Sequence, residues 1–511
     1  MSVTEDRART SGEQTFDSLA PATGDVVATL PVHTEAEVRE AVQRARKAAQ
    51  WWQGIGFAER RKRLRAYAGV LTRRREELLD LVSRENGKPK VDAFLEHFLA
   101  LEHIAWAAKN AERIMKPRKV KGSMMLAGVT PVLEYQPLGV VGVIGPWNYP
   151  IFTPMGSIAY ALAAGNTVVF KPSEFTPAVG VFLADAFREV VPDQPVFQVV
   201  TGFGETGAAL CRAGVDKIAF TGSAPTGRKI MAACAETLTP VLLELGGKDA
   251  LLVDDDADVK SAARAALWGA CANAGQTCIG VERVYVVDSV YDDFVRELTD
   301  AAKDLKSGGD NPVIGPMTMP RQLDIVREHI DEALDRGAKA LVGGRDSVHA
   351  PYIDPVILVD VPDDARVLRE ETFGPVLPVA RVKDLDEAVD KANRTAYGLG
   401  AAVFGKKRAY DAARRLRSGM ASINAVLAYA GFPALPFGGV GESGFGRIHG
   451  EDGLKEFTRA KAITRQRRTV GPDMMSFDRP EWLPKVAAKL GDIRYGRYRR
   501  ARRKPLNLSG R

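Results

Sequence analysis

The first part of the chain carries apolar residues at the spacing of an α-helix. One set begins behind Thr34 and Glu37, which have the spacing of a capping box, and continues to Trp52. This set predicts an amphipathic helix of about five turns. Two further helical patterns cover residues 58–84 and 91–114, and turn-forming residues separate them. The pattern therefore predicts that the chain opens with three helices.

After this helical opening, short apolar runs alternate with helical patterns. Strands are expected at residues 139–144, 167–170, 196–200 and 217–220, and helices at 157–164, 179–190, up to 210, and 225–237. Such a βαβ series predicts a doubly wound parallel sheet, whose ligands lie beyond the carboxyl ends of the strands.

A second alternating region covers about residues 249–439. Strands are expected at 283–287, 352–358 and 400–404, and helices at 290–305 and 386–395. With a length of 511 residues, the two regions predict an α/β protein of two or three domains.

Composition excludes several classes of protein. Apolar residues make up 45% and charged residues 26% of the chain, which excludes disorder throughout. The four cysteines (Cys211, Cys234, Cys271 and Cys278) contain no Cys-x-x-Cys pair, so we expect neither a disulfide framework nor a metal site. A reducing compartment, the cytoplasm, fits this cysteine content best.

The formal charge of +7 is concentrated at one end of the chain. Residues 481–511 carry a net charge of +8, which leaves −1 for residues 1–480. Tyr495 and Tyr498 lie among the arginines of this tail, so nucleic-acid binding through it is a minor alternative. The nearly neutral body gives no reason to expect a nucleic-acid partner.

Two segments bear on membrane targeting. Met1 to Gln14 have no apolar core of a secretory signal. Residues 135–170 form a stretch without a charged residue, and this stretch is long enough for a membrane span. However, Pro137, Pro146, Pro150 and Pro154 interrupt this stretch, and a lipid-exposed helix could not satisfy the freed backbone groups. We therefore interpret it as a buried interior segment.

Two glycine-containing turns are candidates for phosphate binding. Residues 202–207 match Gly-x-Gly-x-x-Gly but lack the acidic residue expected about 20 positions later, so an ordinary strand-to-helix turn is favoured. In residues 220–227, Ser223 or Thr226 stands near a helix start, where free N–H groups bind anions. An ordinary capped helix would give the same pattern.

Lys171 and Glu174 follow directly after a predicted strand, at the sheet edge where ligands bind. Both side chains could hydrogen-bond the hydroxyls of a ribose. Glu174 would repel a 2′-phosphate, which favours NAD over NADP. The alternative is a pair of solvated loop charges.

Three residues are candidates for catalysis. Cys278 follows small residues that suit a thiol presented to a pocket, although most lone cysteines are inert core residues. Glu244 ends an apolar run, so it either serves as a partly buried base or pairs with Lys248. The amide of Asn148 could stabilise an oxyanion or cap a turn.

Seven motifs occur in the order typical of one enzyme family. They are Pro146-Trp147-Asn148, Lys171-Pro172-Ser173-Glu174, Phe220-Thr221-Gly222-Ser223, Glu244-Leu245-Gly246-Gly247-Lys248, Gly275-Gln276-Thr277-Cys278, Glu370-Glu371-Thr372-Phe373-Gly374-Pro375 and Pro436-Phe437-Gly438-Gly439. On these motifs, residues 16–463 of the chain resemble the NAD(P)-dependent aldehyde dehydrogenase superfamily.

This resemblance implies a fold, a reaction and a set of site residues. The fold would comprise two doubly wound α/β domains, one for the cofactor and one catalytic, plus a small oligomerisation β-element. Cys278 would be the nucleophile, Glu244 the base and Asn148 an oxyanion donor. NAD, or alternatively NADP, would be bound by Trp147, Lys171, Ser173, Glu174, Gly222, Ser223, Glu371 and Phe373.

The implied reaction oxidises an aldehyde to a carboxylic acid. The Cys278 thiolate adds to the aldehyde, hydride leaves for the nicotinamide, and water activated by Glu244 hydrolyses the resulting thioester. The alternative is a non-catalytic binding protein that keeps the fold, for which a lost nucleophile or base would be expected. The sequence leaves open which aldehyde is the substrate.

The resemblance also divides the chain. Residues 1–248 would form the NAD(P)-binding domain, with 119–138 in the oligomerisation element, and 249–440 the catalytic domain. Residues 441–468 would return to the cofactor domain and add the oligomerisation strand of a homodimer or homotetramer. Residues 469–511 form a basic extension beyond the family's usual end, either solvated or in peripheral contact with anionic lipid.

The phosphate turn departs from the family's pattern at one point. Ala224-Pro225 stands where a threonine followed by another residue is more common. The expected consequence is an altered fit of the coenzyme.

Overall fold

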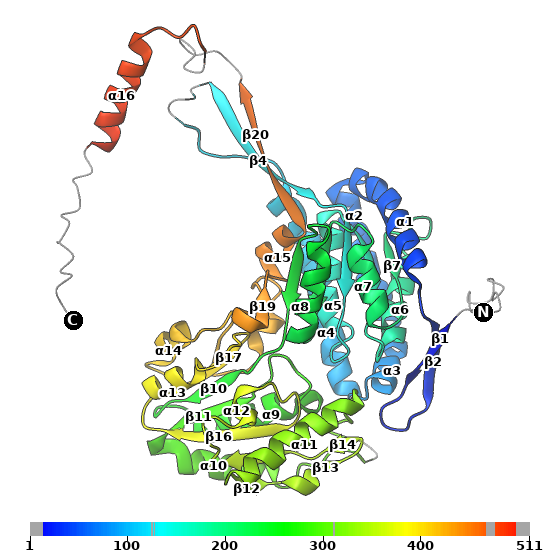
Figure 1. Ribbon diagram of the computed structural model, residues 1–511, viewed down its shortest axis with the longest axis vertical. Coiled ribbons are helices and arrows are strands. Elements are labelled where there is room, and N and C mark those ends of the chain that lie inside the picture. Colours follow the sequence, from blue (N-terminus) through cyan, green and yellow to red (C-terminus); the bar gives the residue numbers. More distant parts are fainter. Residues whose placement is uncertain (1–13, 124–125, 127, 310–311, 467–475, 497–511) are drawn as a thin grey trace. The chain divides into compact units, whose positions relative to one another are not determined.

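The computed structural model describes residues 14–123, 126, 128–309, 312–466 and 476–496. The chain forms two compact units, one of residues 1–114 and 137–459 and the other of residues 115–136 and 460–511 (Figure 1). We describe each unit by itself.

The first unit opens with a hairpin that the sequence analysis did not predict, followed by four helices. The hairpin consists of β1 (Thr15–Leu19) and β2 (Val26–Pro31), and the helices are α1 (Glu35–Gly54), α2 (Gly56–Arg73), α3 (Arg75–Glu85) and α4 (Lys90–Met115). The predicted capping box is confirmed, because Thr34 and Glu37 each bond to the other's backbone N–H at the start of α1.

The prediction of one helix over residues 58–84 is wrong, because the helix is interrupted at Arg74. The backbone of Arg74 has φ −93° and ψ 21°, outside helical geometry. Its guanidinium bonds Glu77 and, 115 residues further along the chain, Glu189 at 2.9 Å. This tertiary contact fixes Arg74 at the junction of two helices.

A six-stranded sheet follows. Its parallel strands are β5 (Val140–Ile144), β6 (Thr167–Lys171), β7 (Phe197–Val199), β8 (Lys217–Thr221) and β9 (Val241–Glu244), and β19 (Gly444–Phe445) joins β9 antiparallel. The spatial order β9-β8-β5-β6-β7 means that the chain builds outward from β5 in one direction and then in the other. Helices α5 (Phe152–Ala164) and α6 (Pro177–Arg188) cover one face, and α1, α7 (Gly204–Arg212) and α8 (Ala224–Ala235) cover the other (Figure 1). The predicted doubly wound sheet is confirmed.

The uncharged stretch forms the centre of this sheet. Strands β5 and β6 are buried throughout, and almost every residue of α5 between them is buried. Our interpretation of this stretch as an interior segment is confirmed. Among the helices that the structure describes, none combines the length and the apolar character that a membrane crossing requires.

A seven-stranded sheet makes up the rest of the first unit. Its order is β12 (Lys339–Val342), β15 (Val356–Val359), β16 (Val376–Val382), β11 (Arg283–Val287), β10 (Ala250–Val253), β17 (Ala401–Phe404) and β18 (Ser422–Ile423), with only β12 antiparallel to its neighbour. Helices α9 (Val259–Cys271), α10 (Asp288–Ala302) and α11 (Pro320–Asp335) pack on one face, and α13 (Leu385–Ala392) and α14 (Ala409–Arg415) on the other. The shorter elements are η2 (Ala272–Gly275), η3 (Arg345–Ser347), α12 (Arg366–Arg369), η4 (Ala428–Gly431), η5 (Gly441–Ser443) and α15 (Gly450–Glu456).

The single strand predicted at residues 352–358 is wrong. The segment splits into β14 (Tyr352–Ile353), which pairs with β13 (Val348–His349), and β15, which enters the large sheet. Between them, Asp354 accepts a hydrogen bond from the backbone N–H of Ser307 at 2.8 Å, and Pro355 has no N–H to donate. These two residues therefore end one pairing before the next begins.

The second unit consists of a small sheet and a helix. Strands β3 (Arg118–Lys119), β4 (Val129–Pro137) and β20 (Thr458–Gln466) form a sheet in the order β20-β4-β3. Helix α16 (Trp482–Tyr495) lies within the predicted basic extension and was not foreseen. Most of the basic run, including Arg497 and Lys504, lies outside the described residues, as do residues 1–13.

Candidate active site

Cys278 and Glu244 line one cavity of about 230 Å³. Cys278 follows the short turn η2, which begins at the end of α9, and Glu244 is the last residue of β9. The turn brings the backbone of Gly275 against that of Gly374. A Cβ on Gly275 would lie 2.2 Å from the carbonyl carbon of Gly374. The glycine therefore allows the close approach that presents the thiol.

Glu244 is a buried carboxylate that has no internal hydrogen bond. Its residue is 2% exposed, and neither carboxylate oxygen has a hydrogen-bond partner among the described residues. Burial raises its pKa well above the usual carboxyl value, and the nearby Arg447 only partly opposes this shift. An unsatisfied carboxylate that faces a cavity is available to water or substrate.

The pKa of the Cys278 thiol is raised above its usual value, which favours the protonated form. Burial raises its pKa, and the neighbouring carboxylates of Glu371, Asp249 and Glu244 raise it further. Burial therefore shifts the pKa values of both Cys278 and Glu244 toward their uncharged forms. Ionisation of the thiol therefore needs a base or a cationic group next to it.

Glu244 does not pair with Lys248, the alternative considered from the sequence. The Nζ atom of Lys248 lies 2.5 Å from Glu282 and 3.1 Å from the Oγ1 atom of Thr372. Glu282 also accepts the N–H groups of Thr372 and Phe373. Glu282 was not predicted as a site residue. Its signal in the sequence was a pair of charges, Glu282 and Arg283, inside the otherwise apolar run 279–287.

A buried ion pair positions the loop that carries Asn148. Lys88 lies 2.6 Å from Glu96, and its Nζ atom also donates to the backbone carbonyl of Asn148 at 2.9 Å. The second oxygen of Glu96 accepts the N–H of Ile151 at 2.6 Å, at the start of α5. Lys88 and Glu96 had no signal in the sequence, because their roles depend on contacts about 60 residues away.

The side chain of Asn148 points to the loop that carries the thiol. Its Nδ2 atom donates to the carbonyl of Gln276 at 2.9 Å, two residues before Cys278. Since a side-chain amide has two N–H donors, this bond uses one of them. Asn148 is buried but is not among the residues that line the cavity.

Lys171, Ser173 and Glu174 gather at the carboxyl end of β6. The Nζ atom of Lys171 and the Oγ atom of Ser173 each lie 3.4 Å from the carboxylate of Glu174. The Lys171 side chain is 5% exposed and that of Glu174 is 35% exposed. A buried ammonium next to a half-exposed carboxylate can bind a hydroxyl group, because a hydroxyl can accept a hydrogen bond from the ammonium and donate one to the carboxylate.

Gly222 and Ser223 form the turn between β8 and α8. Ser223 is the N-cap residue of α8, but its hydroxyl makes no capping bond and instead donates to Thr226 at 3.1 Å. A Cβ on Gly222 would lie 2.5 Å from the ring of Phe220, so the turn needs a glycine. The first N–H groups of this helix are thus in the arrangement that binds phosphate.

The Gly-x-Gly-x-x-Gly segment, residues 202–207, covers the end of the turn between β7 and α7 and the first residues of α7. Within it, the hydroxyl of Thr206 donates to the backbone carbonyl of His33 at 3.1 Å. This bond ties the turn to the segment before α1.

Glu371, Phe373 and Trp147 are the residues expected to hold the nicotinamide half of the coenzyme. Glu371 accepts the N–H of Gly247 at 2.9 Å, and burial raises its pKa to about 8. The ring of Phe373 meets that of Trp147 edge to face at 5.5 Å. Phe373 has φ 51°, and the bond from its N–H to Glu282 holds this conformation.

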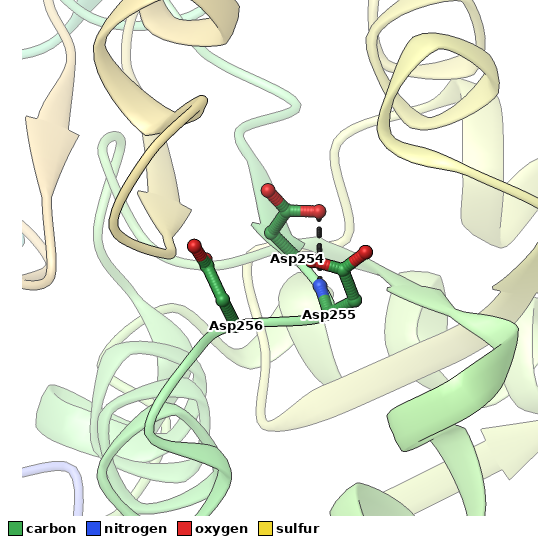
Figure 2. Close-up of side chains that lie close together, drawn as sticks. All are labelled: Asp254, Asp255 and Asp256. Carbon is green, nitrogen blue, oxygen red and sulfur yellow. Dashed lines mark hydrogen bonds between the residues drawn. The ribbon is translucent and has the colours of Figure 1, made fainter.

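Three consecutive carboxylates lie apart from this site, at the end of β10. Figure 2 shows Asp254, Asp255 and Asp256 close together, with the N–H of Asp255 bonded to Asp254. Arg408 pairs with Asp254 and Asp255, and Asp256 accepts the backbone N–H of Lys406 at 2.8 Å. The chain itself therefore compensates these charges, and the cluster links β10 to the loop after β17.

The structure combines a doubly wound sheet, a turn of the phosphate-binding type, and a cavity that a thiol and a carboxylate share. This combination is typical of a dinucleotide-dependent enzyme with a cysteine nucleophile. The family model described as "Aldehyde dehydrogenase family" matches residues 8–463. The chain belongs to the aldehyde dehydrogenase family.

Individual relatives agree with this assignment. The chain is 38% identical over 479 residues to 4,4'-diapolycopene aldehyde oxidase of Methylomonas sp, covering 93% of this chain and 89% of the relative. It is 36% identical to a putative succinate-semialdehyde dehydrogenase [NADP(+)] 2 of Mycobacterium ulcerans, covering 87% of each chain. Among solved structures, an NAD-dependent aldehyde dehydrogenase from Sinorhizobium meliloti matches with a TM-score of 0.86 and 35% identity, covering 90% of this chain and 93% of that one.

The comparisons confirm the resemblance, the α/β fold class and the enzyme activity predicted from the sequence. The protein is an oxidoreductase that oxidises an aldehyde with NAD or NADP, through the cysteine chemistry general to the family.

Proposed function

We propose that Cys278 is the nucleophile, Glu244 the base and Asn148 an oxyanion donor of this aldehyde oxidation. The observation that carries the proposal is the shared cavity onto which the Cys278 thiol and the unpartnered Glu244 carboxylate both open. The proposal rejects the non-catalytic alternative, for which neither residue would be needed.

The residues divide the reaction between them. The ionised form of Glu244 takes the proton of the Cys278 thiol and passes it to solvent. The resulting thiolate attacks the aldehyde carbon, and the free N–H of the Asn148 amide stabilises the oxyanion that forms. Bound NAD or NADP supplies the acceptor for the hydride. Ionised Glu244 then takes a proton from water, and this water attacks the acyl carbon on Cys278. The Cys278 thiolate leaves, and the carboxylic acid is released. The raised pKa of Glu244 suits a group that must accept a proton and give it up again.

The coenzyme is bound along the carboxyl edge of the first sheet. Lys171, Ser173 and Glu174 hold the ribose of the adenosine, and Gly222 and Ser223 hold the pyrophosphate at the start of α8. Trp147, Glu371 and Phe373 hold the nicotinamide half. NAD is the preferred coenzyme. The carboxylate of Glu174 lies 3.4 Å from the Nζ atom of Lys171, so a 2′-phosphate bound next to Lys171 would be repelled by Glu174.

A comparison of Cys278→Ala with Cys271→Ala tests the catalytic assignment. Both residues are free cysteines near the end of α9, but only Cys278 lines the cavity. We expect Cys271→Ala to reduce NAD with an aldehyde panel like the wild type, and Cys278→Ala to show no aldehyde-dependent NADH formation. Equal activity of the two variants would overturn the assignment.

We also propose the domain roles and an oligomer of two or four chains. Residues 1–248 bind the coenzyme, 249–440 supply the thiol, and 441–468 return to the first part. In the second unit, β20 is an edge strand of nine largely exposed residues, and such an edge favours pairing with another chain. Light scattering after gel filtration tests this. A monomer at micromolar concentration would contradict it.

The C-terminal extension is proposed to contact an anionic lipid surface. Trp482, Val486, Leu490 and Ile493 are exposed and lie four, four and three positions apart on α16. Lys485 and Lys489 lie on the same helix, and residues 481–511 carry a net charge of +8. A basic helix with an apolar stripe is suited to a membrane interface.

Sedimentation with vesicles tests the lipid contact. We expect the full chain to sediment with phosphatidylserine vesicles at low salt but not with phosphatidylcholine vesicles, and a chain ending at residue 475 to stay in solution with both. Equal sedimentation of the shortened chain would contradict the proposal. The four free cysteines support the separate proposal that the protein works in a reducing compartment.

A further inference from the structure

We infer that the substrate of this site is an uncharged, largely apolar aldehyde, and that the cavity discriminates against aldehydes that carry a carboxylate. The inference rests on the proposed function, because it takes the cavity that Cys278 and Glu244 share as the substrate site. It names the class of substrate, which the catalytic residues alone do not determine.

The wall of the cavity is mainly apolar. Aliphatic and aromatic side chains come from several separate segments, which include the helices α4, α5 and α9 and the loop around η4. Those from these four segments include Leu99, Phe152, Trp268, Val426 and Leu427. The volume of about 230 Å³ exceeds the about 150 Å³ that accommodates one benzene ring in a dry cavity. The site therefore has room for a ring or for several methylene groups next to the thiol.

The opening of the cavity is apolar as well. Leu95 and Trp268 both line it, and they remain 44% and 48% exposed. An apolar residue that is both part of a cavity wall and open to solvent marks the entrance. A substrate longer than the cavity would continue over these two side chains instead of meeting polar groups.

The cavity offers no partner to a carboxylate on the substrate. Among the described residues, those that line it include no Lys, Arg or His. The buried cation Lys88 lies over the ring of Tyr149, 4.0 Å from its centroid, and is already paired with Glu96. Burying a carboxylate without a cation or several donors is strongly unfavourable.

The charged groups in the wall are all acidic. Asp92 lies on α4, and Glu96 follows it one turn later. The ion pair with Lys88 neutralises Glu96. Among the described residues Asp92 has no ion pair. Burial raises the pKa of Asp92, and the charge of Lys88 and the backbone N–H of Asn273 oppose this shift. An ionised Asp92 would repel a substrate carboxylate, and we assign it as a specificity-determining residue.

A panel of matched aldehydes tests the inference. Hexanal is compared with 6-oxohexanoate, and benzaldehyde with 4-carboxybenzaldehyde, at saturating NAD. We expect kcat/KM to be at least about 100-fold higher for the uncharged member of each pair. From butanal to octanal, kcat/KM should rise about threefold to fourfold for each added methylene, the value of about 0.8 kcal/mol per buried CH₂.

The outcomes separate the inference from the proposed function. Equal or better use of the carboxylated members, or a clear preference for an aldehyde with an ammonium group, would overturn the inference and leave the catalytic assignment intact. Failure to oxidise any member of the panel would overturn the catalytic assignment instead.

Two variants test the charge argument directly. Asp92→Asn removes the acidic group, and Leu95→Arg adds a cation at the exposed entrance. Each should narrow the ratio of kcat/KM between hexanal and 6-oxohexanoate by about tenfold, mainly through a lower KM for 6-oxohexanoate. Glu102→Gln, at an exposed position of α4 outside the cavity, should leave the ratio unchanged. If the ratio of kcat/KM between hexanal and 6-oxohexanoate stays unchanged in both Asp92→Asn and Leu95→Arg, charge in the cavity wall does not determine the choice of substrate.

Discussion

The Nζ atom of Lys248 donates to the carboxylate of Glu282 at 2.5 Å, and both side chains are almost fully buried. Lys248 follows β9, the strand that ends in Glu244, and Glu282 precedes β11. Because Glu282 also holds the N–H groups of Thr372 and Phe373, one carboxylate connects the first sheet, the second sheet and the Glu371 loop.

The first prediction concerns this pair. Glu282→Gln leaves the ammonium of Lys248 buried without its counter-charge, and we expect the free energy of unfolding to fall by about 3–5 kcal/mol. Urea denaturation measures this change. Asp293→Asn is the matched control, because its ion pair with Arg296 is exposed and should contribute less than about 1 kcal/mol. Similar losses of unfolding free energy in the two variants would show that burial does not determine how much an ion pair contributes to stability.

The second prediction concerns Glu244 and pH. Its folded pKa lies above the unfolded value of 4.5, so the native protein holds a proton that the unfolded chain releases. Stability therefore falls as pH rises through this window. Glu244→Gln should be inactive in hydrolysis yet more stable than the wild type at pH 8, with the difference shrinking toward pH 4.5. Thermal unfolding at both pH values measures this, and an equal difference at both would contradict it.

The third prediction concerns the oxyanion. Asn148→Ala removes an N–H donor and should lower kcat by about 10²–10³-fold with a much smaller change in KM. Steady-state kinetics with one uncharged aldehyde measures both constants. A loss confined to KM would mean that Asn148 acts only by holding the loop at Gln276.

The fourth prediction concerns coenzyme choice. Glu174→Gln removes the charge that would face a 2′-phosphate, and the ratio of kcat/KM for NADP over NAD should rise by about tenfold or more. Glu236→Gln is the control, because Glu236 is an exposed carboxylate that pairs with Arg212 outside the proposed coenzyme site. An unchanged ratio in Glu174→Gln would remove this carboxylate from the argument for NAD.

The sequence predicted those elements whose residues carry the pattern locally. The strand at residues 283–287 and the capping box at Thr34 were correct because an apolar run and a three-residue spacing are sufficient to specify them. The break at Arg74 was missed because it depends on Glu189, a partner far away in the sequence.

The same reasoning separates the site residues that were found from those that were missed. Cys278, Glu244 and Asn148 stand in recognisable motifs, and the structure brings all three to neighbouring segments. Lys88, Glu96 and Glu282 hold these segments in place, but each acts through backbone groups that only the folded chain brings near. Asp92 and the apolar wall were missed for this reason too.

The protonated state of Cys278 also bears on chemical damage. Peroxides and disulfides react with thiolates far more readily than with thiols. A thiol whose pKa is raised by burial should therefore be oxidised slowly while no reactants are bound. The environment that makes this residue a poor nucleophile at rest should extend the working life of the enzyme between turnovers.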